Sequence, residues 1–587
     1  MIGPLRLVDV AKSNPAAEAA HRATAAMLAC LESGKSFVLE AGAGAGKTYS
    51  LVEALRYLVA RHGRELSRGY RRIACITFTN VAKNEIISRT DGNPLIFCET
   101  THAFSWSLIS SFQKKLRTEV FNLPSWTDRR AEAGDIDRLK VEYTLGHRSI
   151  EDGVLSLHHD DILALTITFL SSQRFRDLLT DKYPFILIDE YQDTNADWIS
   201  AVKEHLLGAA RAPLFGFFGD HWQKIYGDGC GSIEHDALTR IGKEANFRSV
   251  KVVVDSLNRM RPELQQMVKD PDAEGVVRVF HTNGWVGARR TGAHWAGDLP
   301  VELARSSLAK VQTALMNEGW DFSPAVTKVL MLTHRALATN LGYASLPSVF
   351  RYNDSFAKKS DKHIAFFADH LEPACEAFLN RRYGEMFTAL GGKAPQITGN
   401  GDKAAWSDAM KRLCELRVTG TVRDVITHLR AVGRPRLPDD IVRLEDKLAS
   451  FDPNGGEEKP RRLEELEKLH AVHYSEIIKL VGYLKGHSPF ETKHGVKGVQ
   501  FENVLVVVGR GWSDYNFDEF LQLVANPDRI AARSEAYQRY RNLFYVACSR
   551  PQKRLALLFT QKLCPDALGT IQNWFGAEVI TEIDPRP

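Results

Sequence analysis

The sequence predicts an α/β protein built on mainly parallel sheets. Short apolar runs, each of a length suited to one buried strand, alternate along the chain with stretches of helical pattern. Apolar runs of this kind are typical of parallel strands that helices cover on both faces. The clearest runs in the first half are residues 37–39, 73–78, 185–188 and 214–218. Because 587 residues exceed what one core supports, we expect about three or four domains.

The second half of the chain repeats this plan. Apolar runs at 329–333, 503–508 and 555–559 indicate strands, and a helix is expected at about 532–550 between the last two. Residues 270–300 are rich in glycine, and we expect them to be irregular. The two halves therefore predict two α/β units.

Three helical stretches complete the predicted architecture. Residues 16–31 are rich in alanine and predict a helix before the first strand. Residues 105–182 and 346–487 are mostly helical in pattern and interrupt the first and second α/β unit, respectively. Each α/β unit is thus expected to carry a mainly helical insertion.

The composition is that of a globular protein, with 44% hydrophobic and 25% charged residues. The net charge of +4 does not exclude a nucleic-acid groove, because such a groove needs only a local basic lining. The eight cysteines form no Cys-x-x-Cys pair, which favours reduced thiols over disulfides or a zinc site. No signal peptide and no apolar run of about 20 residues is apparent, so we expect a cytoplasmic protein without membrane contact.

Residues 41–48, Ala-Gly-Ala-Gly-Ala-Gly-Lys-Thr, follow the first predicted strand and precede a helix. This layout predicts a phosphate-binding loop, because glycines let backbone N–H groups turn toward phosphate oxygens at a helix N-terminus. Lys47 can then reach the β- and γ-phosphates, and Thr48 can hold Mg²⁺. Ala41 stands where the strict pattern has glycine, so a tight turn is the alternative interpretation of the loop taken alone.

Asp189 and Glu190 stand at the end of the strand predicted at 185–188. Taken alone, such a pair is usually a solvated helix start. Beside a phosphate-binding loop, one carboxylate can hold Mg²⁺ while the next polarises an attacking water. Together with the loop at 41–48, the pair favours a nucleoside triphosphatase.

Nine short motifs in the chain resemble, in family order, those of the superfamily 1A DNA helicases, the UvrD/Rep/PcrA-like group. That family's loop tolerates alanine at its first position, which accounts for Ala41. The resembling segments are residues 41–48, 77–85, 100–102, 189–195, 219–226, 246–249, 329–335, 492–501 and 545–550.

The resemblance implies a P-loop NTPase with two RecA-like domains and ATP bound between them. The implied domains are 1A at 1–104 and 183–245, and 2A at 246–345 and 488–587. The implied helical insertions are 1B at 105–182 and a compact 2B at 346–487.

The resemblance also implies roles in binding and hydrolysing ATP with Mg²⁺. The implied metal ligands are Thr48 and Asp189, and Glu190 is the implied catalytic base. Gln223 is expected to sense the γ-phosphate, and Arg248 and Arg550 are expected to act as arginine fingers from the second α/β unit. The implied nucleotide-binding residues are Gly42, Gly44, Gly46, Lys47, Thr48, Tyr49, Phe247 and Gln500.

A further implied set of residues contacts single-stranded DNA, along which the motor is expected to move from 3′ to 5′. The alternative interpretation of the aromatic and histidine members is a core phenylalanine and histidines with internal partners. The implied DNA-binding residues are Phe78, Thr79, Asn80, Thr101, His102, Tyr226, Thr492 and His494.

Several positions depart from the family pattern. No glutamine precedes Gln113, although the family reads adenine with one upstream of the loop. Tyr49 replaces the family's arginine after the loop, and Gln500 replaces a glutamate expected near the ribose. Asp228 and Gly229 replace an aromatic residue and an arginine that help to separate bases. ATP selectivity and strand separation are therefore open, and Trp222 is a candidate substitute for the missing aromatic.

Residues 363–376, with Leu-Glu-Pro-Ala at 371–374, resemble the small helicase subunits of two-gene phage-defence systems of the Gabija type. This resemblance implies a partner ATPase-nuclease of the OLD family, and no nuclease constellation is apparent in the chain itself. Two functions follow. The chain is either an ATP-dependent 3′-to-5′ helicase or translocase on single-stranded or 3′-tailed DNA, in repair or anti-phage defence, or a DNA-responsive ATPase subunit that licenses a partner nuclease and unwinds poorly.

Overall fold

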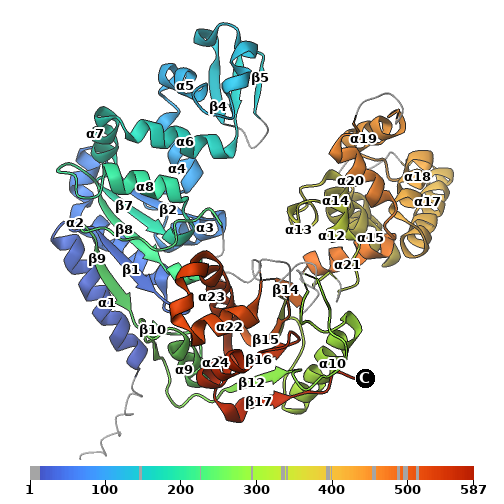
Figure 1. Cartoon of the computed structure of the whole chain (residues 1–587). Coiled ribbons are helices and arrows are strands. Elements are labelled where there is room, and N and C mark those ends of the chain that lie inside the picture. The colour runs from blue at the N-terminus through green and yellow to red at the C-terminus, as the bar shows by residue number, and fades with distance from the viewer. Residues whose placement is uncertain are drawn as a thin grey trace, which may run out of the picture. The chain divides into compact units, whose positions relative to one another are not determined.

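Two six-stranded sheets form the α/β parts of the chain (Figure 1). The computed structural model describes residues 14–143, 148–224, 227–292, 295–331, 337–338, 341–391, 397, 399–452, 458–485, 490–492, 500–510 and 515–587. Contacts divide the chain into two compact units. The first unit comprises Met1–Val277, Glu519–Leu555 and Cys564–Val579, and the second comprises Arg278–Asp518, Ala556–Leu563 and Ile580–Pro587.

The first sheet has the strand order β3-β2-β7-β8-β1-β9, and all of its pairings are parallel. The order places the end of β1 between the ends of β8 and β9. Residues that follow these three strands therefore meet at one edge of the sheet. The strands are β1 (Phe37–Ala41), β2 (Ile73–Thr77), β3 (Ile96–Thr100), β7 (Phe185–Asp189), β8 (Leu214–Gly219) and β9 (Thr239–Lys243).

Helices cover both faces of this sheet because successive side chains of a buried strand point to opposite sides. Phe37 and Leu39 pack with α1 (Pro15–Glu32) and α2 (Lys47–Arg68) on one face. Val38 belongs to the other core, which includes residues of α4, α6 and α8. Figure 1 shows these two helical layers. The other helices around this sheet are α3 (Asn80–Arg89), α4 (Thr101–Ile109), α6 (His159–Leu170), α7 (Gln173–Lys182) and α8 (Ala196–His205).

The insertion at 105–182 is mostly helical, as predicted, and it also contains a three-stranded sheet that the sequence analysis did not expect. The sheet has the order β4-β6-β5, and its buried Val141, Leu155 and Leu157 join the core that packs against α6. Strands of three or four residues carry too short an alternation to be recognised from sequence. The elements are α5 (Gln113–Val120), η1 (Thr127–Ala133), η2 (Ile136–Arg138), β4 (Lys140–Tyr143), β5 (Ser149–Glu151) and β6 (Val154–Leu157).

Segments far apart in sequence complete the first unit. Helix α9 ends directly before Arg261-Pro262, because proline disfavours a helical conformation in the preceding residue. The elements are η3 (Tyr191–Asp193), η4 (His221–Gln223), β10 (Ala245–Asn246), α9 (Lys251–Met260), β11 (Met267–Val268), α22 (Phe517–Ala525), η6 (Pro527–Arg529), η7 (Ala531–Arg533), α23 (Ser534–Cys548), α24 (Pro565–Phe575) and η8 (Ala577–Val579).

The second sheet has the order β14-β13-β15-β16-β12-β17. Strand β13 pairs in parallel with β14 and β15, and β12 pairs in parallel with β17. Strand β12 lies within the segment expected to be irregular, which was wrong for residues 276–281. The elements are β12 (Val276–His281), α10 (Val301–Asn317), β13 (Thr327–Met331), β14 (Phe490–Thr492), β15 (Phe501–Val508), β16 (Pro551–Phe559) and β17 (Ile580–Glu582).

The insertion predicted at 346–487 is helical throughout its described elements and has its own core. Its helices are α12 (Leu346–Val349), α13 (Asp354–Ala357), α14 (Lys362–Phe366), η5 (Phe367–Leu371), α15 (Glu372–Leu379), α16 (Tyr383–Ala389), α17 (Asn400–Thr419), α18 (Val422–Val432), α19 (Asp439–Ala449), α20 (Arg461–His470) and α21 (Tyr474–Leu484). The predicted fold class is confirmed: the chain is an α/β protein with parallel sheets, as in the RecA-like domains of P-loop NTPases. The predicted domain boundaries stay a prediction.

The helical insertion contains a buried ion pair whose loss should destabilise it. The Nε of Arg417 on α17 donates to Oε1 of Glu372 on α15 at 2.8 Å, and both side chains are buried. Because Glu372→Gln leaves a buried charge unpaired, we expect the free energy of opening of α15 and α17 to fall by about 3–5 kcal/mol, measured by native-state hydrogen exchange.

The matched control is Glu415→Gln, which breaks the exposed pair between Arg412 and Glu415 on the same helix α17. An exposed pair contributes at most about 1 kcal/mol, so exchange in α15 and α17 should change little. Equal effects of the two substitutions would contradict a structural role for the buried pair.

Candidate functional site

The loop at 41–48 connects β1 to α2 at the edge of the first sheet. Gly44 and Gly46 have φ angles of 74° and 75°, a left-handed conformation that glycine adopts without steric cost. Helix α2 begins at Lys47, so its free backbone N–H groups and its partial positive charge lie at the end of the loop. Backbone N–H groups in this arrangement can bind an anion, and the binding of phosphate by this loop stays a prediction.

Two amide side chains hold the loop in place. Asn246 Nδ2 donates to the carbonyl of Ala43 at 3.1 Å, and Gln266 Nε2 donates to the same carbonyl at 3.2 Å. A Cβ added at Gly42 would lie 2.6 Å from Gln266 Nε2, so the loop packs directly on this amide. The sequence analysis missed Gln266, because nothing near it in the chain signals a contact with a loop 223 residues away.

Asn246 also positions the residues that follow it. Its Oδ1 accepts hydrogen bonds from the backbone N–H groups of Arg248 and Ser249, both at 2.9 Å. The backbone N–H of Phe247 donates to the carbonyl of Gly44 at 2.9 Å. The segment 246–249 is therefore fixed to the loop, and the Arg248 backbone is fixed with it.

The two acidic residues predicted at the end of β7 lie near Lys47. Lys47 Nζ is 3.9 Å from Glu190 Oε1, and Gln192 Nε2 donates to Glu190 Oε2 at 2.5 Å. Glu190 has a φ of 48°, a left-handed conformation that is unusual for a residue with a side chain. The loop lysine and the predicted base are thus brought together.

Asp189, at the end of β7, is a buried carboxylate that its protein neighbours satisfy only in part. It is buried, and its Oδ1 has no hydrogen-bond partner among the described residues. Burial and the neighbouring charge of Glu190 raise the pKa of Asp189 to about 7, although Lys47 opposes this. A divalent cation would supply the missing charge and partner, so Asp189 fits a Mg²⁺ site together with Thr48.

Gln223 lies between an acidic and a basic side chain. Its Nε2 donates to Asp220 Oδ2 at 2.8 Å, and its Oε1 accepts from Arg550 Nη2 at 3.2 Å. Asp220 in turn accepts from Arg261 Nη1 at 2.6 Å. Burial alone would raise the pKa of Asp220, but the charges of Arg261 and Lys47 outweigh it and the pKa is lowered. The carboxylate therefore stays ionised and orients Gln223.

The two predicted arginine fingers lie in the same compact unit as the loop. Arg248 Nη1 donates to the Ser549 carbonyl at 2.9 Å, and Arg550 Nε donates to the Val546 carbonyl at 2.9 Å. Burial, followed by the charge of Arg248, lowers the pKa of Arg550 to about 9. These buried guanidinium groups would gain most from a strongly anionic ligand.

Two exposed aromatic rings lie beside Gly46. A Cβ added at Gly46 would lie 3.9 Å from Phe247 Cδ2 and 3.9 Å from Tyr49 Cβ. These rings, 39% and 57% exposed, are available to stack on a flat base. Gln500, which the sequence places at the same ligand, is exposed in the second unit, and its role stays a prediction.

A second lysine, Lys243 at the end of β9, contacts the start of α2, and the sequence analysis missed it. Lys243 Nζ donates to the Gly46 carbonyl at 3.0 Å and to Ser50 Oγ at 2.8 Å. Burial, followed by the charge of Lys47, lowers the pKa of Lys243 to about 8. Lys243 adds positive charge where a polyphosphate would bind.

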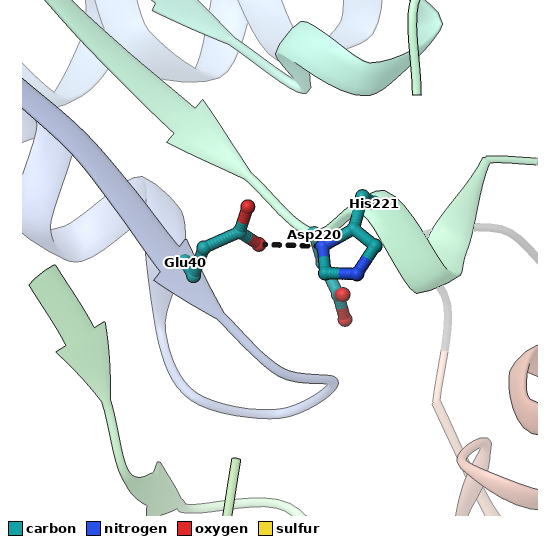
Figure 2. Close-up of side chains that lie close together, drawn as sticks. All are labelled: Glu40, Asp220 and His221. Atoms are coloured by element: carbon teal, nitrogen blue, oxygen red, sulfur yellow. Dashed lines mark hydrogen bonds and ion pairs between the residues drawn. The ribbon is translucent and has the colours of Figure 1, made fainter. Parts of the chain in front are cut away.

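Figure 2 shows Glu40, Asp220 and His221 converging where β1 and β8 end. His221 Nδ1 and Glu40 Oε2 lie 3.3 Å apart, and the Tyr191 hydroxyl donates to the other oxygen of Glu40. Because Arg261 pairs with Asp220, each carboxylate has protein partners. The contact between His221 and Glu40 ties the η4 turn to β1, Asp220 is held separately by Arg261, and no metal is required to explain these side chains.

The structure describes some of the predicted DNA-binding residues and leaves others outside the described parts of the chain. Phe78 is 38% exposed at the end of β2, and Asn80 begins α3. Thr79 Oγ1 accepts from the Ala82 N–H at 3.2 Å and so caps α3, while Thr101 is buried at the start of α4. Tyr226, His494 and the side chain of Thr492 lie outside the described residues.

His102 lies at the start of α4 and stacks on His159, with ring centroids 3.3 Å apart. Burial, followed by the charge of the neighbouring His159, lowers the pKa of His102 to about 4. The imidazole is therefore neutral near pH 7 in the protein without DNA. This agrees with the interpretation of His102 as an internally packed histidine, and its contact with DNA stays a prediction.

The described structure brings the predicted phosphate loop, the acidic pair and the two arginines together in one compact unit, an arrangement typical of P-loop NTPases. Residues 24–228 match the family model described as AAA domain. The chain is also similar to the Gabija protein GajB of Bacillus cereus (strain HuB5-5), with 21% identity over an alignment of 680 residues that covers 93% of this chain and 96% of that protein. The predicted resemblances to UvrD/Rep-like helicases and to Gabija-type subunits are confirmed. No helix in the described parts of the chain is long and apolar enough to cross a membrane.

The fit of Gly44 can be tested with Gly44→Ala. An added Cβ would lie 2.7 Å from Arg248 Cβ and 2.9 Å from Asn246 Oδ1, so the loop must separate from these residues. We expect nucleotide affinity, measured by calorimetry, to fall at least about tenfold.

The control for this test is Gly92→Ala. Gly92 shares the positive φ angle, at 59°, but an added Cβ would meet nothing within 4 Å. It should therefore carry the backbone strain and leave nucleotide affinity unchanged. Equal losses in both variants would refute a specific contact at Gly44.

The lowered pKa of His102 predicts a pH dependence of stability. Since the folded pKa of about 4 lies below the usual value of 6.5, the unfolded chain binds more protons between these values. The contribution of neutral His102 is complete above pH 6.5 and is lost as the pH falls toward 4. The thermal midpoint of His102→Gln should therefore fall less steeply over this range than that of the wild type, whereas the exposed control His21→Gln should follow the wild type.

Proposed function

We propose that the chain is an ATP-dependent motor that translocates on single-stranded DNA from 3′ to 5′ and serves in defence against phages. The observation that supports this proposal most is the convergence of Lys47, Glu190, Gln223, Arg248 and Arg550 around one phosphate loop. The similarity to a Gabija protein favours defence over general DNA repair.

In this mechanism the loop and the start of α2 bind the triphosphate. Backbone N–H groups and the helix dipole hold the phosphate oxygens, and Lys47 reaches the β- and γ-phosphates. Thr48 and Asp189 would hold Mg²⁺, which neutralises charge on the phosphate oxygens when it is bound. Tyr49 and Phe247 offer rings on which the base can stack, which does not by itself select adenine.

Glu190 is proposed to orient and deprotonate the attacking water. Its carboxylate lies beside Lys47, and Gln192 fixes one of its oxygens. Its left-handed backbone conformation turns the residue away from the path of β7, which fits a strained functional position. Arg248 and Arg550 are placed to stabilise charge that spreads over the γ-phosphate oxygens.

Gln223 is proposed to transmit the state of the γ-phosphate. It is bonded to Arg550 at the end of α23 and to Asp220 at the end of β8. When the γ-phosphate leaves, the arginines lose an anionic partner and the contacts of Gln223 change. Repeated over many cycles, such a change can move DNA-contacting residues such as Phe78 along a strand.

A specific feature favours the second function, an ATPase subunit that licenses a partner nuclease. Gly229 stands where related helicases carry a side chain that helps to separate bases. A Cβ at this position would lie 2.4 Å from the Gln192 carbonyl and 2.9 Å from Asp193 Cα. No side chain fits there, which predicts weak unwinding. An ATPase-nuclease of the OLD family is the proposed partner.

The two functions separate in one pair of measurements on the isolated chain. The first measurement is the rate of ATP hydrolysis, which we expect to rise when single-stranded DNA is added. The second measurement compares the unwinding of 3′-tailed and 5′-tailed duplexes. Unwinding confined to the 3′-tailed duplex supports the helicase. Stimulated hydrolysis without unwinding supports the regulatory subunit, and no hydrolysis with any nucleic acid would overturn both.

Glu190→Gln tests the catalytic assignment. Because glutamine cannot accept the proton of water, ATP turnover should fall at least about a hundredfold while nucleotide affinity is kept. The control Glu244→Gln removes an exposed carboxylate that lies 3.9 Å from Arg22, and it should hydrolyse ATP normally. Retained turnover in Glu190→Gln would show that another group is the base.

A further inference from the structure

The first unit contains a cavity of about 230 Å³ that the proposed mechanism does not use. It lies among η4, the end of α9, α22, α23 and α24. One of its lining residues, Trp222, directly precedes Gln223, the proposed γ-phosphate sensor. Its rim includes the exposed Arg259 and Pro262, so it opens to solvent. We call it the aromatic pocket. Its defining residues are Trp222, Phe520, Tyr537, Arg541, Phe544 and Trp574.

A guanidinium group in this pocket, that of Arg541, forms no direct ion pair with a carboxylate of the described residues. Arg541 lies over the Trp222 ring, 4.1 Å from its centroid, and its hydrogen bonds run to Asn542 Oδ1 at 3.2 and 3.1 Å. No carboxylate oxygen of the described residues comes within 4.0 Å of it. Burial lowers the pKa of Arg541, so the charge is partly desolvated. An anionic ligand would supply the missing charge.

A second polar group in the pocket is also unsatisfied. Trp222 is 6% exposed, and its indole Nε1 has no acceptor among the described residues. A buried donor without an acceptor loses its hydrogen bond to water, and a ligand carbonyl or phosphate oxygen would restore one. This observation is independent of the charge on Arg541.

We propose that the aromatic pocket binds one nucleotide unit, with its base against the aromatic rings and its phosphate at Arg541. A nucleotide combines the three features that the pocket lacks: a flat ring, an anion and hydrogen-bond acceptors. Arg259, whose Nη1 donates to the Trp574 carbonyl at 3.0 Å, offers a second positive charge at the rim. The unit can be a free nucleotide or the terminal nucleotide of a DNA strand.

The pocket is connected to the γ-phosphate sensor by short contacts. Trp222 is the neighbour of Gln223, and Asn542, the neighbour of Arg541, donates to the carbonyls of His221 and Lys224, both at 3.1 Å. Arg261 lies 5.1 Å from the Trp222 ring centroid and pairs with Asp220. A ligand that orders Trp222 and Arg541 orders the η4 turn as well and should raise the rate of ATP hydrolysis.

Binding can be measured without hydrolysis, using the full chain with Lys47→Ala to disable the phosphate loop. The probes are deoxyadenosine monophosphate, and a short oligonucleotide with and without a 5′-phosphate, each titrated by calorimetry. We expect at least one phosphorylated probe to bind, and Arg541→Gln to weaken it at least about tenfold, as for the loss of a charged hydrogen bond. The mononucleotide arm identifies a free ligand, and binding of the oligonucleotide alone identifies a DNA end.

Two further variants keep the test independent of folding. Val524→Phe fills the pocket without removing its polar groups and should abolish binding, whereas Arg539→Gln, on the exposed surface of α23, should not. The absence of binding by all three probes, or an affinity in Arg541→Gln and Val524→Phe that equals that of the Lys47→Ala chain without them, would overturn the proposal. Only the stimulation of hydrolysis rests on the proposed function. Binding measured in the Lys47→Ala chain tests the pocket whether or not the proposed function is correct.

Discussion

The hydrogen bonds of the Asn246 carboxamide hold the candidate nucleotide site together. Its Nδ2 holds the carbonyl of Ala43 in the phosphate loop, and its Oδ1 accepts from the N–H groups of Arg248 and Ser249. One planar group therefore fixes the loop and the first arginine in a single geometry. Gln266 supports it from the other side by donating to the same carbonyl. These hydrogen bonds stabilise the loop in the conformation in which its glycines have positive φ angles.

Near Asn246 and Gln266 lie several buried charges that their protein neighbours balance only in part. Burial lowers the pKa values of Lys243 and Arg550, and it raises the pKa of Asp189. Each shift marks a charge that the protein alone stabilises poorly. A nucleoside triphosphate with a divalent cation would complement all three charges. Its phosphates would lie near Lys243 and Arg550, and its cation would lie near Asp189. Such an arrangement is costly to fold but is already organised for the charge that would develop in the proposed phosphoryl transfer.

The end of β8 connects this site to the rest of the first unit. Asp220 pairs with Arg261, and the contact in Figure 2 ties the neighbouring His221 to Glu40 on β1. On the far side of the same turn, Trp222 contacts Arg541 and lines the aromatic pocket. The three-residue turn η4 thus holds Gln223, the proposed γ-phosphate sensor, between these two sets of contacts. Ligands at the loop and at the pocket would both act on Gln223 through it.

The sequence by itself determined the α/β class, the phosphate loop and the acidic pair, because these depend on short spacings and on strands whose apolar runs are continuous. It also identified Gln223, Arg248 and Arg550, but only through their resemblance to a family. The tertiary structure alone decided that Gln266 and Lys243 belong to the site, since both meet a loop about 200 residues earlier in the chain. It likewise revealed the small β4-β6-β5 sheet and strand β12, whose short strands gain their stability from partners and from burial that no local pattern records.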